Sequence, residues 1–319
     1  MSRPIVGVIG GGAWGLALAA AASRTGGTTL LLSRRAHNGE TPPGIELVKE
    51  GGELADRARL IVLAVPSFVA REVVRGLGPH LDGHHFIVHG VRGLVRRPDD
   101  GTGRPEQLET ISDIVRDETP VRRIGALGGP ALASDLLAAH PSVMVCGSRY
   151  PEVIVALRAA FEGPNLRLYA TADLLGLEWA SALVGCLAIA VGYARGAGLG
   201  PGLLAAVITR AVEEGARLAA AAGGDDRTLL GLAGYGDLLA SIAQTDRPEL
   251  LVGEALARGK PIEQAVADAK QRVEAVELTG RVAAWAEVRG VSAPLFRTLA
   301  RSVLSGRTSD ALVRALMSG

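Results

Sequence analysis

The chain has 319 residues, of which 48% are hydrophobic and only 3% aromatic, and its formal net charge is +1 at pH 7. This length predicts two domains of about 150 residues each, and the near-neutral charge argues against nucleic acid as a partner. The two cysteines, Cys146 and Cys186, are too few for a disulfide framework and fit a reducing compartment. Arg195 breaks the longest apolar stretch, so we expect no membrane span. These features predict a cytoplasmic protein.

The first predicted elements are a strand over 5–9 and a helix over 13–24. Between them Gly10, Gly12 and Gly15 have the spacing G-x-G-x-x-G. In a strand–turn–helix unit the first glycine permits a tight turn, the second lets the backbone approach a pyrophosphate, and the third lets the helix pack on the strand. The helix N-terminus then offers N–H groups to the anion. The stretch predicts NAD or NADP binding; the alternative is a glycine-rich turn that only packs an α/β layer.

Short apolar runs and helical patterns continue to alternate up to about residue 170. The strands are predicted over 28–32, 60–65, 85–89, 122–127, 142–147 and 166–169, and the helices over 67–76, 105–116 and 150–160. Buried strands that alternate with helices are typical of a doubly wound parallel sheet. We therefore predict an α/β Rossmann-type dinucleotide-binding domain over 1–172, with an exposed polar loop over 96–105.

The end of the second strand bears on the choice of coenzyme. An acidic residue at this point would bind the adenosine ribose and favour NAD, but the sequence has Ser33-Arg34-Arg35. Guanidinium groups suit a 2′-phosphate, so NADP is favoured. The alternative is that Arg34 stacks on adenine or is solvated, and that either coenzyme is accepted.

Helical periodicity replaces the strand signals after about Asp173. Helices are predicted over 174–196, 201–223, 261–289 and 291–317, with breaks at Gly and Pro. We therefore predict an all-α C-terminal domain over 173–319 that takes part in substrate binding and in a homodimer interface. A small-molecule substrate is expected in the cleft between the two domains.

Several motifs in chain order resemble the NAD(P)-dependent glycerol-3-phosphate dehydrogenase family. They are GGGAWGLAL from Gly10, AVPSF from Ala64, LGGPALASD from Leu127, AVITR from Ala206, LGLAGYGDL from Leu230 and QRVEAVELT from Gln271. The resemblance implies coenzyme contacts at Trp14, Pro66, Ala133 and Glu274. It also implies hydride transfer between a nicotinamide and dihydroxyacetone phosphate or glycerol 3-phosphate.

The chain departs from that family where substrate polar groups are expected. Val184 and Gly185 stand at the positions of a family lysine and asparagine, and Arg92 stands at that of a second lysine. The Arg-Asn pair that helps bind phosphate aligns with Pro248-Glu249, although Arg247 is one residue away. These substitutions suggest a related substrate that depends less on its phosphate.

When a ketone carbon accepts a hydride, its oxygen becomes an alkoxide, so the site needs a proton donor and a cation that polarises the oxygen. Asp237 is a candidate acid/base group, with a helix N-cap as the alternative. His89 ends a predicted strand and has a suitable imidazole, with a structural role as the alternative. Arg92 can hold an anion but is a poor proton donor.

The remaining candidates are substrate-binding residues. Ser181 can hydrogen-bond a substrate oxygen or simply pack in its helix, and Arg210 and Arg247 are candidate anion ligands. The histidine spacings match no metal site. The leading hypothesis is an NAD(P)-dependent dehydrogenase acting on CH–OH, and the alternative is a coenzyme-binding regulatory protein that has lost the chemistry.

Overall fold

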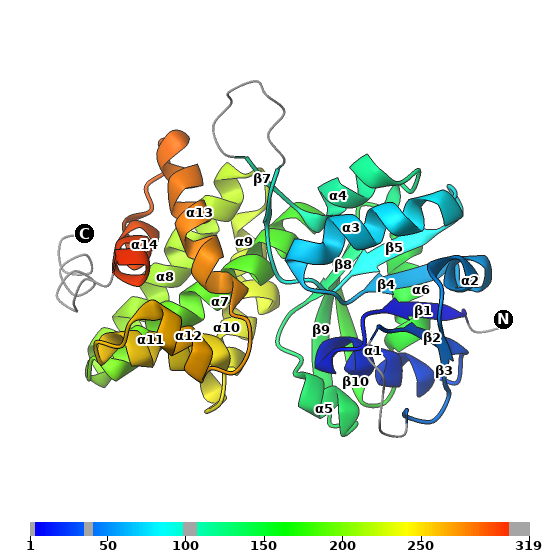
Figure 1. Cartoon of the computed structure of the whole chain (residues 1–319), viewed down its shortest axis with the longest axis horizontal. Coiled ribbons are helices and arrows are strands. Elements are labelled where there is room, and N and C mark those ends of the chain that lie inside the picture. Colours follow the sequence, from blue (N-terminus) through cyan, green and yellow to red (C-terminus); the bar gives the residue numbers. More distant parts are fainter. Residues whose placement is uncertain (1–3, 35–40, 98–106, 306–319) are drawn as a thin grey trace. The chain divides into compact units, whose positions relative to one another are not determined.

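The computed structural model describes residues 4–34, 41–97 and 107–305. The chain divides into two compact units, which are described separately below (Figure 1). The first unit comprises Met1–Arg92 and Thr110–Glu178, and the second comprises Gly93–Glu109 and Trp179–Gly319. The boundary between residues 172 and 173 stays a prediction.

The first unit is built on one sheet with the strand order β10-β9-β8-β5-β4-β1-β2-β3. All neighbouring strands run parallel except β8 and β9, which are antiparallel. The strands are β1 Val6–Ile9, β2 Thr29–Leu32, β3 Ile45–Val48, β4 Leu60–Leu63, β5 Phe86–His89, β8 Arg123–Gly128, β9 Ser142–Gly147 and β10 Leu166–Thr171. This sheet confirms the predicted Rossmann-type class.

Helices cover both faces of this sheet, because successive residues of a buried strand point to opposite sides. Val6 and Val8 pack with α1, α5 and α6 in one core cluster. On the other face, a Cβ added at Gly7 would lie 2.6 Å from Leu54 of α2, and α3 and α4 lie together in Figure 1. The helices are α1 Ala13–Ser23, α2 Gly51–Arg57, α3 Ser67–Leu77, η1 Gly78–His80, α4 Ile111–Glu118, α5 Ala133–Leu137 and α6 Pro151–Phe161.

One expectation for this half of the chain needs correction. The helix predicted over 105–116 begins at Ile111, because Thr110 caps it by accepting a hydrogen bond from the backbone N–H of Asp113. Just before it, β7 (Leu108–Glu109) pairs antiparallel with β6 (Val95–Arg96) in the second unit. Most of the polar loop predicted over 96–105 lies outside the described residues.

The second unit is helical apart from β6 and β7 among the residues that the structure describes. Its helices are α7 Leu174–Gly196, α8 Pro201–Ala221, α9 Asp226–Leu230, η2 Leu232–Gly236, α10 Asp237–Ala243, α11 Pro248–Ala257, α12 Ile262–Asp268, α13 Glu274–Val288 and α14 Pro294–Ser305. The start of α7 belongs to the first unit, and η2 is a π-helix. The single helix predicted over 261–289 is wrong. It is interrupted where Lys270 adopts a φ of +54°, which a helix cannot continue through.

The centre of this unit is α7. Its length and apolar composition would allow it to cross a membrane, but 94% of its most apolar window is buried inside the fold. Gly192 on α7 and Gly253 on α11 allow a close crossing, because a Cβ on either would lie within 2.3 Å of a backbone oxygen of the other helix. Such burial is typical of the core helix of a soluble protein.

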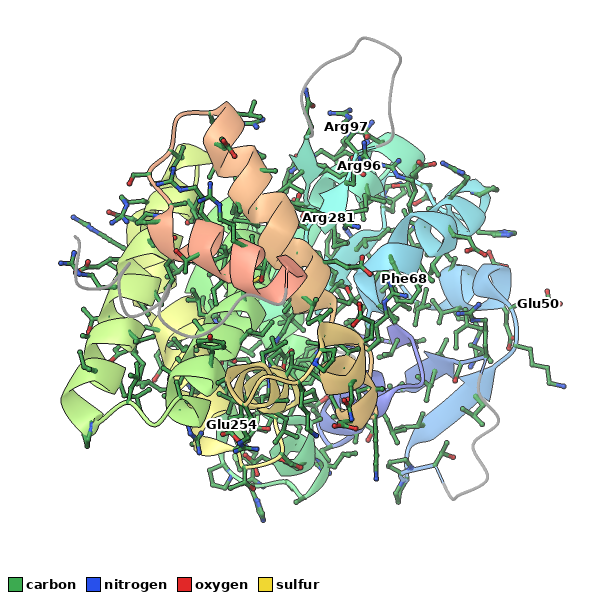
Figure 2. All side chains as sticks on the ribbon, turned by 60° about the vertical axis from the view of Figure 1, so that its left-hand side comes forward. Glu50, Phe68, Arg96, Arg97, Glu254 and Arg281 are labelled. Atoms are coloured by element: carbon green, nitrogen blue, oxygen red, sulfur yellow. The ribbon has the colours of Figure 1, made fainter. Side chains whose placement is uncertain are left out.

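Ion pairs on the helix surfaces of this unit are mostly exposed. Glu254 of α11 lies 3.2 Å from Arg258 and 3.7 Å from Arg195, and Arg281 of α13 lies 3.2 Å from Glu277 (Figure 2). Exposed pairs of this kind contribute roughly 0–1 kcal/mol each. The stability of the unit therefore depends on its apolar interior.

Candidate coenzyme loop and polar clusters

The glycine loop joins β1 to α1 in the geometry that the spacing predicts. Gly10 has a φ of +121°, and a Cβ there would lie 2.2 Å from the carbonyl oxygen of Ala64 at the end of β4. A Cβ on Gly15 would lie 1.9 Å from the carbonyl oxygen of Gly10. Both positions therefore exclude any side chain, for reasons that lie within the fold itself.

Gly12 is different, because a Cβ there would meet no atom within 4 Å. It precedes α1, whose first turn has no side-chain cap. The first N–H groups of a helix have no partner within the helix and attract anions. An open backbone next to these N–H groups fits the diphosphate of NAD or NADP.

The other predicted coenzyme residues of this unit follow the ends of its strands or begin its helices. Trp14 packs on the turn after β5, since a Cβ on Gly90 would lie 2.6 Å from the Trp14 indole Nε1. Pro66 is exposed directly before α3, and Ala133 is the half-buried first residue of α5. Arg34 is exposed two residues after β2, and Arg35 lies outside the described residues.

A buried polar cluster surrounds His89 at the end of β5. The His89 Nε2 lies 2.9 Å from Glu178 Oε1, and the backbone N–H of Ser112 donates to the same oxygen at 2.9 Å. All three residues are buried. Because the carboxylate accepts, His89 carries a hydrogen on Nε2. Its Nδ1 and the Ser112 hydroxyl have no hydrogen-bond partner in the described part of the chain.

Neither the His89–Glu178 pair nor the contact with Ser112 was predicted. Glu178 and Ser181 are three residues apart and so share one face of α7, but nothing local in the sequence links that face to β5. Arg92, three residues after His89, is half-buried. The structure therefore assigns His89 a specific carboxylate partner.

The second unit has its own polar cluster where α11 approaches α7. Val184 is completely buried, and a Cβ on Gly185 would lie 3.5 Å from Glu249 Oε1. The Arg247 Nε donates to Glu249 Oε2 at 2.7 Å, and the two side chains are only 15% and 19% exposed. Glu249 thus occupies space next to Gly185 and neutralises Arg247.

Asp237 is fully buried at the start of α10. The N-cap alternative is wrong, because Gly236 already has helical backbone angles and Asp237 continues directly from η2. The Ser241 hydroxyl lies 3.5 Å from Asp237 Oδ1. A π-helical turn is rare and is often found at functional sites, and its five residues fall within the LGLAGYGDL motif.

The remaining candidates of the second unit lie in different environments. The buried hydroxyl of Ser181 has no hydrogen-bond partner among the described residues. Arg210 is exposed and lies 3.7 Å from Glu213, and Glu274 is the half-buried first residue of α13. Ser181 therefore retains an unused donor and acceptor, whereas Arg210 is a solvated surface cation.

Metal and thiol chemistry find little support. Within the described ranges no group of three or more His, Cys, Asp and Glu side chains is placed to hold a metal ion. Cys146 and Cys186 are free and buried. Burial raises the pKa of the Cys146 thiol to about 11 and that of Cys186 to about 12, so neither forms a reactive thiolate at neutral pH.

Two family models match the chain. They describe the NAD-dependent glycerol-3-phosphate dehydrogenase N-terminus, over residues 33–154, and its C-terminus, over residues 173–314. A glycerol-3-phosphate dehydrogenase [NAD(P)+] of Azotobacter vinelandii is 31% identical, covering 100% of this chain and 96% of its own. One of Thermus thermophilus is 32% identical over 98% of both chains.

A solved structure agrees with these relatives. The glycerol-3-phosphate dehydrogenase of Coxiella burnetii has a TM-score of 0.86 and 26% identity, covering 99% of this chain and 98% of its own. The fold, the glycine loop and the full-length similarity agree with one another. The chain therefore belongs to the NAD(P)-dependent glycerol-3-phosphate dehydrogenase family of oxidoreductases.

Proposed function

We propose that this protein is a dehydrogenase that transfers a hydride between NAD(P)H and a small ketone or its secondary alcohol. The names of its relatives suggest glycerol 3-phosphate, whose ketone is dihydroxyacetone phosphate. The observation that carries the proposal is the open backbone at Gly12 beside the uncapped start of α1. Bound NADPH would supply the hydride, and the protein must bind the coenzyme, orient the ketone and provide a proton.

The proposed coenzyme residues fall into three groups. Gly10, Gly12 and Gly15 form the loop itself, and Trp14, Pro66, Ala133 and Glu274 are proposed as further contacts. Arg34 and Arg35 are proposed to hold a 2′-phosphate, which favours NADP. Support comes from the exposed guanidinium of Arg34 and from the absence of an acid directly after β2.

Reversing the charge at Arg34 tests the proposed preference for NADP over NAD. Arg34→Glu should weaken NADPH binding at least tenfold in calorimetry and leave NADH binding unchanged or improved, since one charge-assisted contact is lost. Arg167→Glu is a matched control, because this exposed arginine lies on β10. Equal losses for both coenzymes would contradict a role for Arg34 in the 2′-phosphate site.

The proton is proposed to come from His89. In its imidazolium form His89 would hold one hydrogen on Nε2 toward Glu178 and would donate the other from Nδ1 to the alkoxide, which leaves neutral imidazole. Arg92 is proposed to polarise the ketone oxygen, and Asp237 is proposed as an acid/base relay or orienting group. Ser181, Arg210 and Arg247 are the proposed substrate-binding residues.

The substrate is proposed to depend less on a phosphate group than the name of the family implies. Arg247, the nearest cation to the missing Arg-Asn pair, is already neutralised by Glu249 at 2.7 Å. The negative charge of Glu249 would also repel a substrate phosphate placed beside it. The second candidate function, a coenzyme-binding regulatory protein, is favoured by one observation, the completely buried Val184 at the position of the family lysine.

One experiment separates these functions. NADPH oxidation is followed by absorbance with dihydroxyacetone phosphate and with a panel of small neutral ketones, and the binding of NADPH and of NADH is measured calorimetrically in the same buffer. Turnover of any ketone supports the dehydrogenase. Tight NADPH binding without turnover of any ketone in the panel supports the regulatory protein. Failure to bind either coenzyme contradicts both proposed functions.

The remaining proposals concern assembly and location. We propose a homodimer formed through the helical unit and a cytoplasmic location, supported by the two free thiols. Light scattering at several protein concentrations tests the dimer. A constant monomer mass over that range would contradict it.

A further inference from the structure

The first unit contains a cavity that the proposed reaction does not use. It has a volume of about 270 Å³ and lies among the C-terminal ends of α1, α5 and α6 and the start of β10. Its floor is apolar and is formed by Ala21, Leu136, Phe161 and Leu166, all of them buried. Pockets that combine an apolar floor with a few polar groups are typical of small-molecule sites.

The cavity is distinct from the glycine loop. The loop lies at the N-terminal end of α1, whereas Arg24, which lines the cavity, follows the last residue of that helix. A rise of 1.5 Å per residue separates Gly12 from Arg24 by about 18 Å along the helix. A coenzyme bound at the loop would therefore leave the cavity open at the far end of α1.

The walls of the cavity are held in place by hydrogen bonds between the helix ends. The Arg24 guanidinium donates to the carbonyl oxygens of Leu136 and Leu137 and so joins α1 to α5, which lie side by side in Figure 1. The Thr25 hydroxyl lies 3.3 Å from the carbonyl oxygen of Ala160 and joins α1 to α6. The cavity is thus preformed, which lowers the entropic cost of binding a ligand.

The rim of the cavity favours a negative charge. Arg158, His140 and Asn165 line it, and the Nδ1 of His140 lies 3.3 Å from Asp135 Oδ1. The one acid in the lining, Glu162, already accepts a hydrogen bond from the backbone N–H of Leu168 at 3.1 Å, and its other oxygen lies 4.0 Å from Arg158 Nε. The Arg158 guanidinium therefore retains donors for a ligand.

A positively charged ligand finds fewer partners there. The C-terminal carbonyl groups of a helix attract cations, but those of Leu136 and Leu137 at the end of α5 are occupied by Arg24. We propose that this cavity is a binding site for a small organic carboxylate with an apolar body. Its apolar part would lie on Phe161 and Leu136, and its carboxylate would face Arg158. The volume equals that of about nine water molecules, which suits one ring or a short chain.

Three probes of equal ring size but different charge test the site. Benzoate, benzamide and benzylamine are titrated into the full-length protein saturated with NADPH, and binding is followed by ligand-observed NMR. Benzoate should bind with a dissociation constant on the order of millimolar, at least fivefold more tightly than the other two. Absence of benzoate binding, or equal binding of benzamide, would overturn the proposal.

Variants locate the binding. Arg158→Gln should weaken benzoate at least fivefold, and Ala21→Leu should abolish binding by filling the floor. Arg116→Gln is the matched control, because its side chain on α4 is 41% exposed against 48% for Arg158 and does not line the cavity. Benzoate binding that is insensitive to Arg158→Gln would overturn the proposal, even if Ala21→Leu fails to fold. The outcome does not depend on whether the protein turns over any ketone.

Discussion

His89 Nε2 and Glu178 Oε1 lie 2.9 Å apart, although the two residues are separated by 89 positions in the sequence. The same carboxylate oxygen accepts the backbone N–H of Ser112. Glu178 therefore fixes both the ring orientation and the tautomer of His89, while the buried Nδ1 has no hydrogen-bond partner in the described part of the chain.

His89→Gln should lower kcat by about 100-fold with NADPH binding unchanged, because a general acid typically contributes at least that factor. Glu178→Gln keeps an acceptor for Ser112 but no longer stabilises the imidazolium that donates the proton, so it should move the alkaline limb of the pH–rate profile for ketone reduction to lower pH. Steady-state kinetics across pH provide the measurement. A purely structural pair would lower the melting temperature in both variants and leave the pH profile in place.

Gly12 and Gly15 should respond to substitution in opposite ways. A Cβ at position 12 meets no atom of the protein within 4 Å, so Gly12→Val should fold normally and lose coenzyme binding by blocking the pyrophosphate. Gly15→Ala forces a Cβ to within 1.9 Å of the Gly10 carbonyl oxygen and should destabilise the first unit by about 1–3 kcal/mol.

Urea unfolding and calorimetric NADPH titration of both variants measure these effects. If Gly12→Val bound NADPH as tightly as the unmodified protein, the diphosphate would not lie on this loop.

Glu249→Gln should release Arg247. The glutamine has no charge to neutralise the guanidinium, which lies 2.7 Å from the carboxylate in the structure. A free guanidinium next to substrate should lower KM for dihydroxyacetone phosphate by about tenfold, as one charge-assisted hydrogen bond is gained, with little change for neutral ketones.

Glu277→Gln is the control, since the ion pairs of this exposed acid among the described residues are with Arg272 and Arg281 on the surface. An unchanged KM in Glu249→Gln would remove Arg247 from the list of substrate ligands.

The first unit should lose stability in acid through Glu118. Hydrogen bonds from Arg75 and Arg71 lower the pKa of this carboxyl from its ordinary 4.5 to about 2. A lowered pKa in the folded state means that the unfolded chain binds the proton first. The stabilisation is therefore complete above about pH 4.5 and is lost as the pH falls through about 2.

Glu118→Gln should make the unfolding free energy less dependent on pH between these two values, as measured by urea unfolding at each pH. Glu50→Gln, at an exposed position labelled in Figure 2, should leave the dependence as it is. An unchanged slope in Glu118→Gln would contradict the assigned ion pair.

Local patterns predicted most of the sheet and the glycine loop, because continuous apolar runs and the G-x-G-x-x-G spacing are properties of adjacent residues. They missed β3, since Ile45–Val48 is an edge strand with two exposed residues and a mixed pattern. They also missed α2 and α5, which are too short for a helical period to be recognised. The antiparallel pairing of β8 with β9 is a matter of topology that no single segment encodes.

The polar clusters depend on contacts between distant segments, and this limits what the sequence reveals of them. Glu249 approaches Gly185 only because α11 crosses α7 at Gly192 and Gly253. Resemblance to the family directed attention to positions 184, 185 and 247, but the neutralisation of Arg247 required the three-dimensional contact. The role of Asp237 as an acid/base group stays a prediction, while its N-cap alternative is wrong because a π-helix precedes it.

Each compact unit contains one cysteine, Cys146 on β9 in the first and Cys186 on α7 in the second. Both thiols are buried and have raised pKa values, so alkylating reagents can modify them only when the surrounding unit opens. The protein therefore carries a natural reporter of local unfolding in each half. Mass spectrometry of the two labelled peptides gives two separate opening rates, without any engineered label. Equal rates indicate that the two halves unfold as one cooperative molecule, and unequal rates identify the half that opens first.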